Sequence, residues 1–323
     1  MEMNDADSQS CTVCGKATKC SYLFEKLNTD ICVGSIKIYQ CEVCKCVYLG
    51  QYHKSFDNEL YTYYAKYKGE TKDQVYNSLT KKSYLQVLNL LESFGGGNKI
   101  LDVGCGNGSF VDAAMEQGYE VKGIELSQTA VDIAQAFNLP VQNIDFFSCE
   151  IEVSSYDVLS MFEVIEHLPE PVLFLKRAEQ VVKPGGLIYL TTPNFKSLEQ
   201  RVLGKNWSVF HREHLTYFTP RTLIKTISSN TNLEVLHVET RNLSAEFIAT
   251  LGHLMPSFSS RESKYIDNEL CEPPLLSDTR TRIAKSPLLS FLKQLCNLFL
   301  NATGLGSTIV ILLRRPLLDA GLK

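Results

Sequence analysis

The sequence predicts an α/β fold with a doubly wound, mostly parallel sheet. Strand-like apolar runs alternate with helical patterns along most of the chain, and a glycine-rich turn at 104–108 joins one such run to a helix. The 323 residues, 44% apolar and 21% charged, can build a full core for one large domain with additions or for two domains. In such a sheet, ligands bind at the carboxyl ends of the strands.

The first half of the body begins with a helix predicted over 71–94. Three leucines share one face of this helix, and the glycines at 95–97 stop it. Helices are also predicted over 109–117 and after Ser127, which caps the second of them. Short apolar runs between and beyond these helices predict strands at 100–103, 119–124, 141–144 and 156–161.

The second half continues the same alternation. A helix is predicted over 171–182, and a proline-glycine-glycine turn at 184–186 leads into the next strand. Thr219 and Pro220 open another helix. The remaining strands, at 187–191, 233–238 and 308–313, bring the predicted sheet to seven strands.

Residues 1–50 form a cysteine-rich head in front of this body. Cys11 and Cys14 make one CxxC pair, and Cys41 and Cys44 make a second. Two such pairs predict a closed four-thiolate zinc site of structural type, with a small β-ribbon between the pairs. Free cysteines and a redox CxxC are the alternatives, and three further cysteines (Cys20, Cys32, Cys46) could replace a ligand. The acidic, polar N-terminus shows no secretory signal, and we expect a reducing, cytoplasmic setting.

The segment 51–74 is an aromatic linker rich in tyrosine. Two interpretations stay open for it, a strap that packs the head against the body and a lid over the substrate site.

The glycine turn indicates which cofactor the body binds. Glycines at 104, 106 and 108 follow the pattern GxGxG, whereas dinucleotide sites use GxGxxG. Asp102 lies inside the end of the preceding strand, and Glu125 ends the next strand, where it can take both hydroxyls of a ribose. A carboxylate beside the turn suits a ligand with an ammonium and a sulfonium better than a pyrophosphate. The charge pattern fits S-adenosylmethionine.

Four blocks in order carry a family resemblance: LDVGCGNGSF, GIELS, DVLSMFEVIEHL and KPGGLIYLTTPN. They resemble the motifs of class I S-adenosylmethionine-dependent methyltransferases, and the resemblance covers about residues 75–240. It implies a Rossmann-like fold and a methyltransferase domain over 75–323. The segments CTVCG and CEVCKC ahead of such a domain resemble a subgroup with an N-terminal zinc ribbon, often linked to sugar, polysaccharide or other small-molecule methylation.

The resemblance also implies roles for particular residues. By the family pattern, three groups of positions contact the cofactor: Asp102, Gly104, Cys105 and Gly106 on its methionine part; Glu125 and Leu126 on its ribose and adenine side, with Asp145 near the adenine; and Met161 and Phe162 along its methionine portion.

The motif EVIEH carries the predicted chemistry. Glu163, Glu166 and His167 stand at i, i+3 and i+4, so on a helical turn they share one face. They could bind a divalent ion such as magnesium, or His167 could act as a general base. The motif resembles ubiquinone-pathway O-methyltransferases and small-RNA 3′-terminal 2′-O-methyltransferases; the second group adds a histidine, a role open to His211 or His214. The alternatives are a scaffold motif without metal and a structural histidine.

A helical insertion is expected at about 243–303, with an amphipathic helix over 286–301. The helix either packs on the body or a second copy, or meets a membrane or lipid-linked substrate as a peripheral contact. Lys293 is its one basic residue, which argues against strong attraction to anionic lipid. No apolar run is long enough for a transmembrane helix.

The predicted function is methyl transfer from S-adenosylmethionine to a small-molecule acceptor, with O-methylation of a hydroxyl preferred because His167 could serve as base. C-methylation of a nucleotide-linked sugar remains open. Metal-assisted RNA 2′-O-methylation is a further alternative, but the net charge of −4 argues against a nucleic-acid partner. A non-catalytic zinc-ribbon interaction module is the last, and the intact glycine turn argues against it. The sequence indicates no particular oligomeric state.

Overall fold

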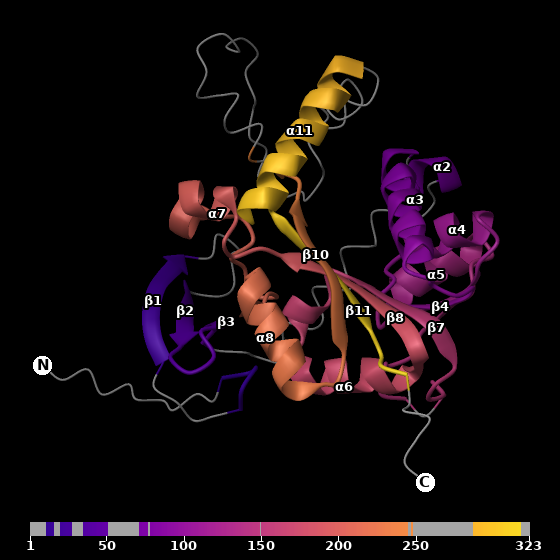
Figure 1. The fold of residues 1–323 in the computed structure, drawn as a ribbon, viewed down its shortest axis with the longest axis horizontal. Helices are drawn as coiled ribbons and strands as arrows, with labels where there is room; N and C mark the ends of the chain where they lie inside the picture. Colours follow the sequence, from indigo (N-terminus) through magenta and orange to yellow (C-terminus); the bar gives the residue numbers. More distant parts are fainter. Residues whose placement is uncertain are drawn as a thin grey trace, which may run out of the picture.

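A computed structural model describes residues 11–15, 20–27, 35–50, 71–76, 78–148, 150–244, 247 and 287–317 (Figure 1). Most of the predicted aromatic linker lies outside the described residues. So does the middle of the predicted insertion.

The main sheet has seven strands in the order β10-β11-β8-β7-β4-β5-β6. Neighbours from β6 to β8 run parallel, whereas β11 runs antiparallel to both β8 and β10. The predicted seven-stranded, mostly parallel sheet is therefore confirmed. Its strands are β4 (Lys99–Val103), β5 (Glu120–Ile124), β6 (Val141–Gln142), β7 (Tyr156–Phe162), β8 (Val182–Pro193), β10 (Glu234–Arg241) and β11 (Thr308–Arg314).

Helices cover both faces of this sheet, and each face has its own core (Figure 1). One core packs α3 (Ser78–Ser93), α4 (Ser109–Glu116) and α5 (Gln128–Ala136) on the sheet. The other packs α6 (Pro171–Val181) and α8 (Pro220–Asn230) on the opposite face. Strand β11 shows the alternation, because Val310 and Leu312 belong to the first core and their neighbours to the second.

The strand order places a site at one point of the sheet. The chain passes from β4 to β5 and β6 in one direction, and then crosses back to β7 on the other side of β4. This reversal is a topological switch point, where the loops after neighbouring strands separate and leave a crevice. The glycine turn follows β4 directly, so it lies in that crevice.

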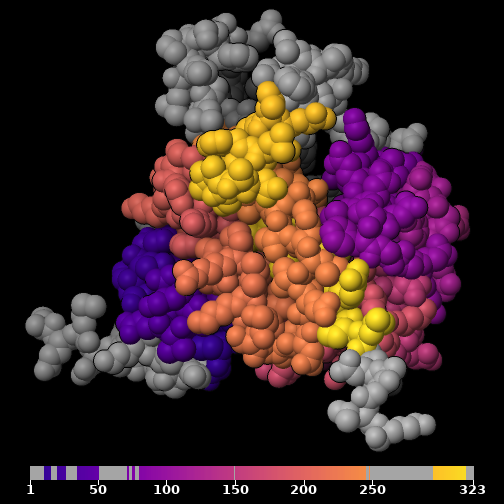
Figure 2. Space-filling model, viewed as in Figure 1, coloured from indigo at the N-terminus to yellow at the C-terminus, as the bar shows by residue number. Residues whose placement is uncertain are grey.

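A second, antiparallel sheet joins the head to the body. Its order is β1 (Cys20–Leu27), β2 (Ser35–Cys41), β3 (Val47–Leu49) and β9 (Thr216–Tyr217). The ribbon predicted between the cysteine pairs is present as β1 and β2. Strand β9 comes from the body, and Figure 2 shows the indigo head lying directly against the salmon and orange segments. The head and the body therefore share a sheet.

The remaining elements are short, apart from one helix. They are α2 (Lys72–Val75), the 3₁₀ turns η3 (Ile165–His167) and η4 (Gly204–Asn206), α7 (Leu198–Leu203) and α11 (Pro287–Thr303). The single helix predicted over 71–94 is wrong, because α2 ends at Val75 and α3 begins at Ser78. The hydroxyl of Tyr76, between them, donates to the carbonyl of Asn107 in the glycine turn, a contact that fixes this break.

Helix α11 extends away from the sheet at the top of Figure 1, and β10 holds its C-terminal end. The side-chain oxygen of Asn301 accepts from the amide of Thr240, 3.1 Å away. Leu295, Leu298 and Phe299 are exposed on this helix. Among the described residues, no helix combines the length and apolar character that crossing a membrane requires.

Candidate functional site

The glycine turn after β4 needs glycine at two points for reasons of space as well as backbone conformation. Gly104 and Gly108 have φ angles of 68° and 84°, in the left-handed region. A Cβ at Gly104 would lie 2.7 Å from a methyl group of Val164, and one at Gly108 would lie 2.8 Å from a methyl group of Leu139. The turn therefore packs tightly against the core and opens directly into α4.

An open cavity of about 160 Å³ lies against this turn. Five of its lining residues were predicted to contact the cofactor, and four were not. The five are Asp102, Gly104, Cys105, Gly106 and Phe162. The four are Tyr84, Asn107, Ser109 and Phe110.

Three aromatic rings make one wall of this cavity. The ring centroids of Tyr84, Phe110 and Phe162 lie 4.9 to 5.4 Å apart in tilted or edge-on pairs. Phe110 and Phe162 stand inside the quoted motifs, so their neighbourhood was visible in the sequence. Tyr84 belongs to α3, before the motif, and no local pattern distinguishes it from the other residues of that helix.

Asp102 supplies the charged group of the cavity. Its side chain is 1% exposed, and Oδ1 accepts a 2.7 Å hydrogen bond from the hydroxyl of Ser160. Its second oxygen, Oδ2, has no hydrogen-bond partner among the described residues. Burial raises the pKa of Asp102 to about 7, and the negative charge of Glu125 adds to the rise. Asp102 lines the cavity, and a buried carboxylate with an unpaired oxygen suits a cationic ligand.

Glu125 lies beside the cavity and outside its lining. Its Oε2 accepts from the amide of Gly106, and Oε1 accepts from the amide of Ser127, both at 2.9 Å. The carboxylate thus joins the glycine turn to the start of α5. Since a carboxylate has about four acceptor positions, two remain for ribose hydroxyls.

Three predicted cofactor residues lie away from the cavity. Leu126 is 54% exposed, and Oδ1 of Asp145 accepts from the amide of Phe147. Met161 is fully buried in the core under α6, on the opposite face of β7 from Phe162. The roles assigned to these residues stay predictions.

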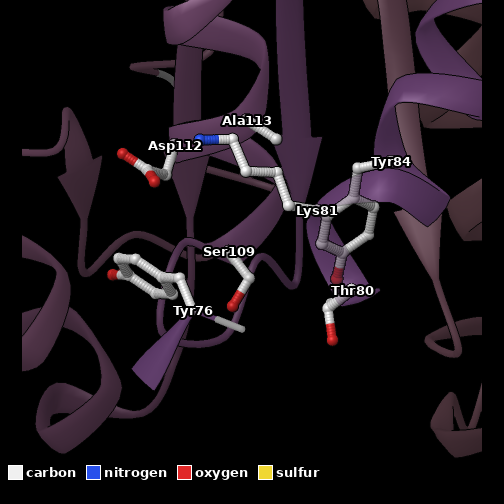
Figure 3. A pocket seen from close by; sticks show the side chains of 7 residues that line it. All are labelled: Tyr76, Thr80, Lys81, Tyr84, Ser109, Asp112 and Ala113. Carbon is white, nitrogen blue, oxygen red and sulfur yellow. The ribbon is translucent and has the colours of Figure 1, made fainter. Parts of the chain in front are cut away.

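A second, much smaller hollow of about 10 Å³, roughly the space of one water molecule, lies between α3 and α4. Figure 3 shows the side chains that line it, and two of them, Tyr84 and Ser109, also line the larger cavity. Lys72 of α2 forms an ion pair with Asp112, another lining residue. Together with the Tyr76 contact to Asn107, this pair holds α2 over the glycine turn.

The EVIEH motif begins one residue after Phe162, at the carboxyl end of β7. The prediction that Glu163, Glu166 and His167 share one face of a helical turn is wrong for Glu163, which has a φ of 55°. Its amide donates to the carbonyl of Thr191 on β8, and this contact continues the sheet by one residue before η3 begins. Glu163 is exposed, whereas Glu166 is buried.

Glu166, His167 and His214 nevertheless come together. One candidate ligand atom from each lies within 4.8 Å of the others, and the two imidazole centroids are 4.6 Å apart. The ring of His211, the alternative to His214, also stacks close to His214, at 3.7 Å. The structure places His214 in the group, and the side chain of Glu163 contacts that of Glu166 at its edge.

Backbone carbonyls fix the orientation of both histidines. Nδ1 of His167 lies 3.0 Å from the carbonyl oxygen of Glu213, and Nδ1 of His214 lies 2.9 Å from that of Val209. Because a carbonyl oxygen only accepts, each Nδ1 carries the proton and each Nε2 presents a lone pair. Burial lowers the pKa of His167 to about 4, so its ring is neutral at pH 7.

Glu166 supplies the carboxylate of this group. Its Oε2 accepts a 2.9 Å hydrogen bond from the hydroxyl of Thr192. Burial and the negative charge of Glu163 raise the pKa of Glu166. Two neutral imidazoles with free lone pairs and one buried carboxylate can hold a divalent metal ion, and without an ion they can hold a proton.

The four head cysteines also converge. Sγ of Cys11 lies 3.6 Å from Sγ of Cys44, and Sγ of Cys14 lies 3.7 Å from Sγ of Cys41. A zinc ion with Zn–S bonds of about 2.3 Å at tetrahedral angles requires an S–S separation of about 3.8 Å. Each CxxC pair closes a turn, in which the amides of Gly15 and Lys45 donate to the carbonyls four residues earlier. The residues present therefore fit a four-thiolate zinc site.

Comparison with known proteins gives one family match and several partial relatives. Residues 76–238 match the family described as "Methyltransferase domain". Ubiquinone biosynthesis O-methyltransferase from Idiomarina loihiensis is 32% identical over 132 residues, 39% of this chain and 52% of that protein. The enzyme of the same name from Acinetobacter baylyi is 31% identical over 118 residues, 33% of this chain and 50% of that protein. The chain thus spans about half the length of these curated relatives.

Solved structures give a more distant match. The crystal structure of a SAM-dependent methyltransferase from Archaeoglobus fulgidus superposes with a TM-score of 0.46 at 16% identity, covering 75% of this chain and 97% of that one.

Proposed function

Because the chain belongs to the methyltransferase-domain family, we propose that it transfers a methyl group from S-adenosylmethionine to a hydroxyl group of a small-molecule acceptor. The observation that carries the proposal is the cavity at the end of β4, whose lining includes the buried Asp102, a carboxyl group with one unpaired oxygen. The partial similarity to ubiquinone biosynthesis O-methyltransferases supports the choice of a hydroxyl.

The residues of the cavity suit the cofactor group by group. Asp102 would hold the ammonium of the methionine part, and the backbone of Gly104 and Gly106 leaves room beside it. The aromatic wall of Tyr84, Phe110 and Phe162 would face the cationic sulfonium region, where ring faces attract positive charge. Glu125 would accept the ribose hydroxyls with its remaining acceptor positions. When bound, S-adenosylmethionine supplies an activated methyl group on sulfur.

The protein would contribute alignment and management of one proton. In-line transfer requires the acceptor oxygen to be held opposite the leaving sulfur, and in this proposal the acceptor would lie near Glu163, directly after Phe162 of the cavity wall. In the absence of a metal ion, Nε2 of His167 would present an oriented lone pair for the hydroxyl proton. A neutral imidazole with a pKa of about 4 is a weak base by itself, so a second group must help.

We propose instead a divalent metal ion at Glu166, His167 and His214. The ion would take the Nε2 lone pair of His167, so His167 would then act as a ligand and not as the base. A bound ion would supply Lewis-acid chemistry that lowers the pKa of the acceptor hydroxyl, whose proton would pass to solvent. Two imidazoles and one carboxylate suit a transition metal such as Mn²⁺ better than the Mg²⁺ expected from the motif, because Mg²⁺ prefers oxygen ligands. Separately, we propose a structural zinc ion at Cys11, Cys14, Cys41 and Cys44, which calls for a reducing compartment such as the cytoplasm.

Metal-assisted RNA 2′-O-methylation is the second candidate. The specific observation in its favour is the position of His214 beside Glu166 and His167. Against it stand the net charge of −4 and the isoelectric point of about 5.9, which give no general attraction to a phosphate backbone.

Isothermal titration with S-adenosylmethionine and its demethylated product, S-adenosylhomocysteine, tests the cofactor assignment. We expect both to bind the wild type, and D102N to lose most of the affinity. Asp132 is an exposed aspartate on α5, so D132N is the matched control and should bind as the wild type does. Absence of binding to the wild type would refute the proposed activity. A screen of hydroxyl-bearing acceptors with a labelled methyl donor then separates small molecules from RNA.

A further inference from the structure

One largely buried loop, 207–214, orients both histidines of the candidate metal group. The carbonyl of Val209 accepts from Nδ1 of His214, and the carbonyl of Glu213 accepts from Nδ1 of His167. The amide of His211 also donates to the Val209 carbonyl, at 3.0 Å. The directions of the two Nε2 lone pairs therefore depend on the path of this loop.

The loop has little regular structure of its own, and the head holds it in place. Lys26, on β1 of the head, reaches 181 residues along the chain to the loop. Its ammonium nitrogen Nζ donates to the carbonyl of Trp207 at 3.1 Å and to the carbonyl of Phe210 at 3.0 Å. These two carbonyls lie on either side of Val209. One half-buried cation thus fixes the segment that carries the acceptor for His214.

Packing and strand pairing support the same contact. Phe24, two residues before Lys26 on the same strand, packs edge-on against Phe210 with ring centroids 4.9 Å apart. After the loop, the carbonyl of Leu215 accepts from the amide of Leu49 on β3. The amide of Leu215 donates to the carbonyl of Glu166 at 2.7 Å. A continuous series of backbone contacts therefore joins the head sheet to the metal group.

From these contacts we propose that Lys26 is a positioning residue, whose ammonium group fixes the 207–214 loop so that His214 keeps its Nε2 directed at Glu166 and His167. The proposal rests on the proposed metal role of this group. It gives the cysteine head a task beyond its own stability, because the head supplies the cation that shapes the second site. Among the described residues, the hydrogen bonds of Lys26 go to the loop and not to the glycine turn or the cofactor cavity.

The matched variants are K26M, K26R and K37M in the full-length protein. Methionine keeps the apolar stem of Lys26 and removes its donors, and arginine restores donors and charge. Lys37 lies on the neighbouring strand β2. It pairs with Glu25, so strand alternation places it on the opposite face of the head sheet from Lys26. K37M therefore removes the same charge without touching the loop.

Two measurements read the geometry without relying on activity. Spectra correlating ring protons and nitrogens in ¹⁵N-histidine protein report which ring nitrogen carries the proton for each of the six histidines. Titration with Mn²⁺, followed by the paramagnetic resonance signal of the free ion, reports the affinity of the metal group. S-adenosylhomocysteine affinity and zinc content serve as measures of the overall fold.

We expect K26M to lose the fixed Nδ1-protonated form of His214 and to bind Mn²⁺ roughly tenfold more weakly, the size typical for loss of an outer contact to a metal ligand. K26R and K37M should match the wild type. Wild-type behaviour of K26M in both measurements would overturn the proposal, and so would a K26M protein that also loses S-adenosylhomocysteine or zinc, because Lys26 would then support the whole fold. If the wild type binds no Mn²⁺, the metal assignment fails, and the histidine spectra alone decide the role of Lys26.

Discussion

Replacing Asp102 with asparagine separates the binding role of this carboxyl group from its effect on stability. Burial raises the pKa of Asp102 from 3.8 to about 7. Between these two values the native state holds a proton that the unfolded state has released, so the folding contribution of Asp102 is complete below pH 4 and falls as pH rises toward 7. The fall is about 1.4 kcal/mol per pH unit, or about 4 kcal/mol over the whole interval.

Asparagine does not titrate, and its side-chain oxygen can still accept the hydrogen bond from Ser160. Relative to the wild type, D102N should therefore gain about 2 kcal/mol of unfolding free energy when the pH is raised from 5.5 to 7. Urea unfolding of both proteins in matched buffers measures this difference. The same variant should bind S-adenosylhomocysteine roughly ten- to a hundredfold more weakly, because a hydrogen bond to a charged group contributes about 1.5–3 kcal/mol.

The two effects have opposite signs, which makes the test demanding. If D102N gains stability relative to the wild type as the pH rises and also binds the ligand more weakly, then Asp102 lowers the stability of the fold but is needed for ligand binding. Parallel pH dependence of stability in D102N and wild type would refute the raised pKa. Unchanged ligand affinity would refute the assignment of Asp102 to the ammonium. D132N should show neither effect, since Asp132 is exposed.

Three further predictions concern the turn, the strand end beside it and the head. E125Q should remain folded but weaken S-adenosylhomocysteine binding at least about fivefold in calorimetry, because an amide offers fewer acceptor positions to ribose hydroxyls. G104A should lower the thermal midpoint more than G95A does; both glycines have positive φ, but only at Gly104 does the added carbon meet a neighbour, at 2.7 Å. Equal midpoints would contradict this packing argument. C41S should lose zinc, measured by plasma emission, and should unfold at a lower urea concentration. C296S, at an exposed cysteine, should keep the zinc content and the urea midpoint of the wild type. A full zinc content in C41S would exclude the four-thiolate site.

Much of the fold and half of the site follow from local pattern. Most strands of the parallel sheet contain a short buried run, and the spacing of the glycines marks the turn, although Ile124, Glu125 and Val164 help to hold its shape. The four cysteines could be grouped because paired spacing brings thiolates together within a few residues. These features depend on interactions close in sequence, which periodicity and spacing record directly.

The other half of the site, and some elements of the fold, depend on contacts between residues far apart in the sequence. Strand β9 has two residues, too few for any alternation, and it forms only because β3 of the head pairs with it. The conformation of Glu163 follows from an amide that continues the sheet onto β8, which overrides the helical spacing of its motif. Tyr84 reaches the cavity from a helix whose pattern indicates only which face packs on the sheet.

The cofactor half of the site and the half around Glu166 and His214 come from different parts of the chain. Most of the cofactor half of the site is built by the β4 turn, the end of β5 and α4, between Asp102 and Glu125, and Tyr84 and Phe162 complete the cavity wall. The half around Glu166 and His214 is assembled from η3, the 207–214 loop and the head sheet, which meet only after the chain has folded. A change in the head can therefore alter the second half while Asp102 and the glycine turn keep their geometry. We expect acceptor preference to depend on the head and the loop, and donor binding to be independent of both. Exchanging the head for that of a related chain would test this, with donor affinity and acceptor preference measured in separate assays.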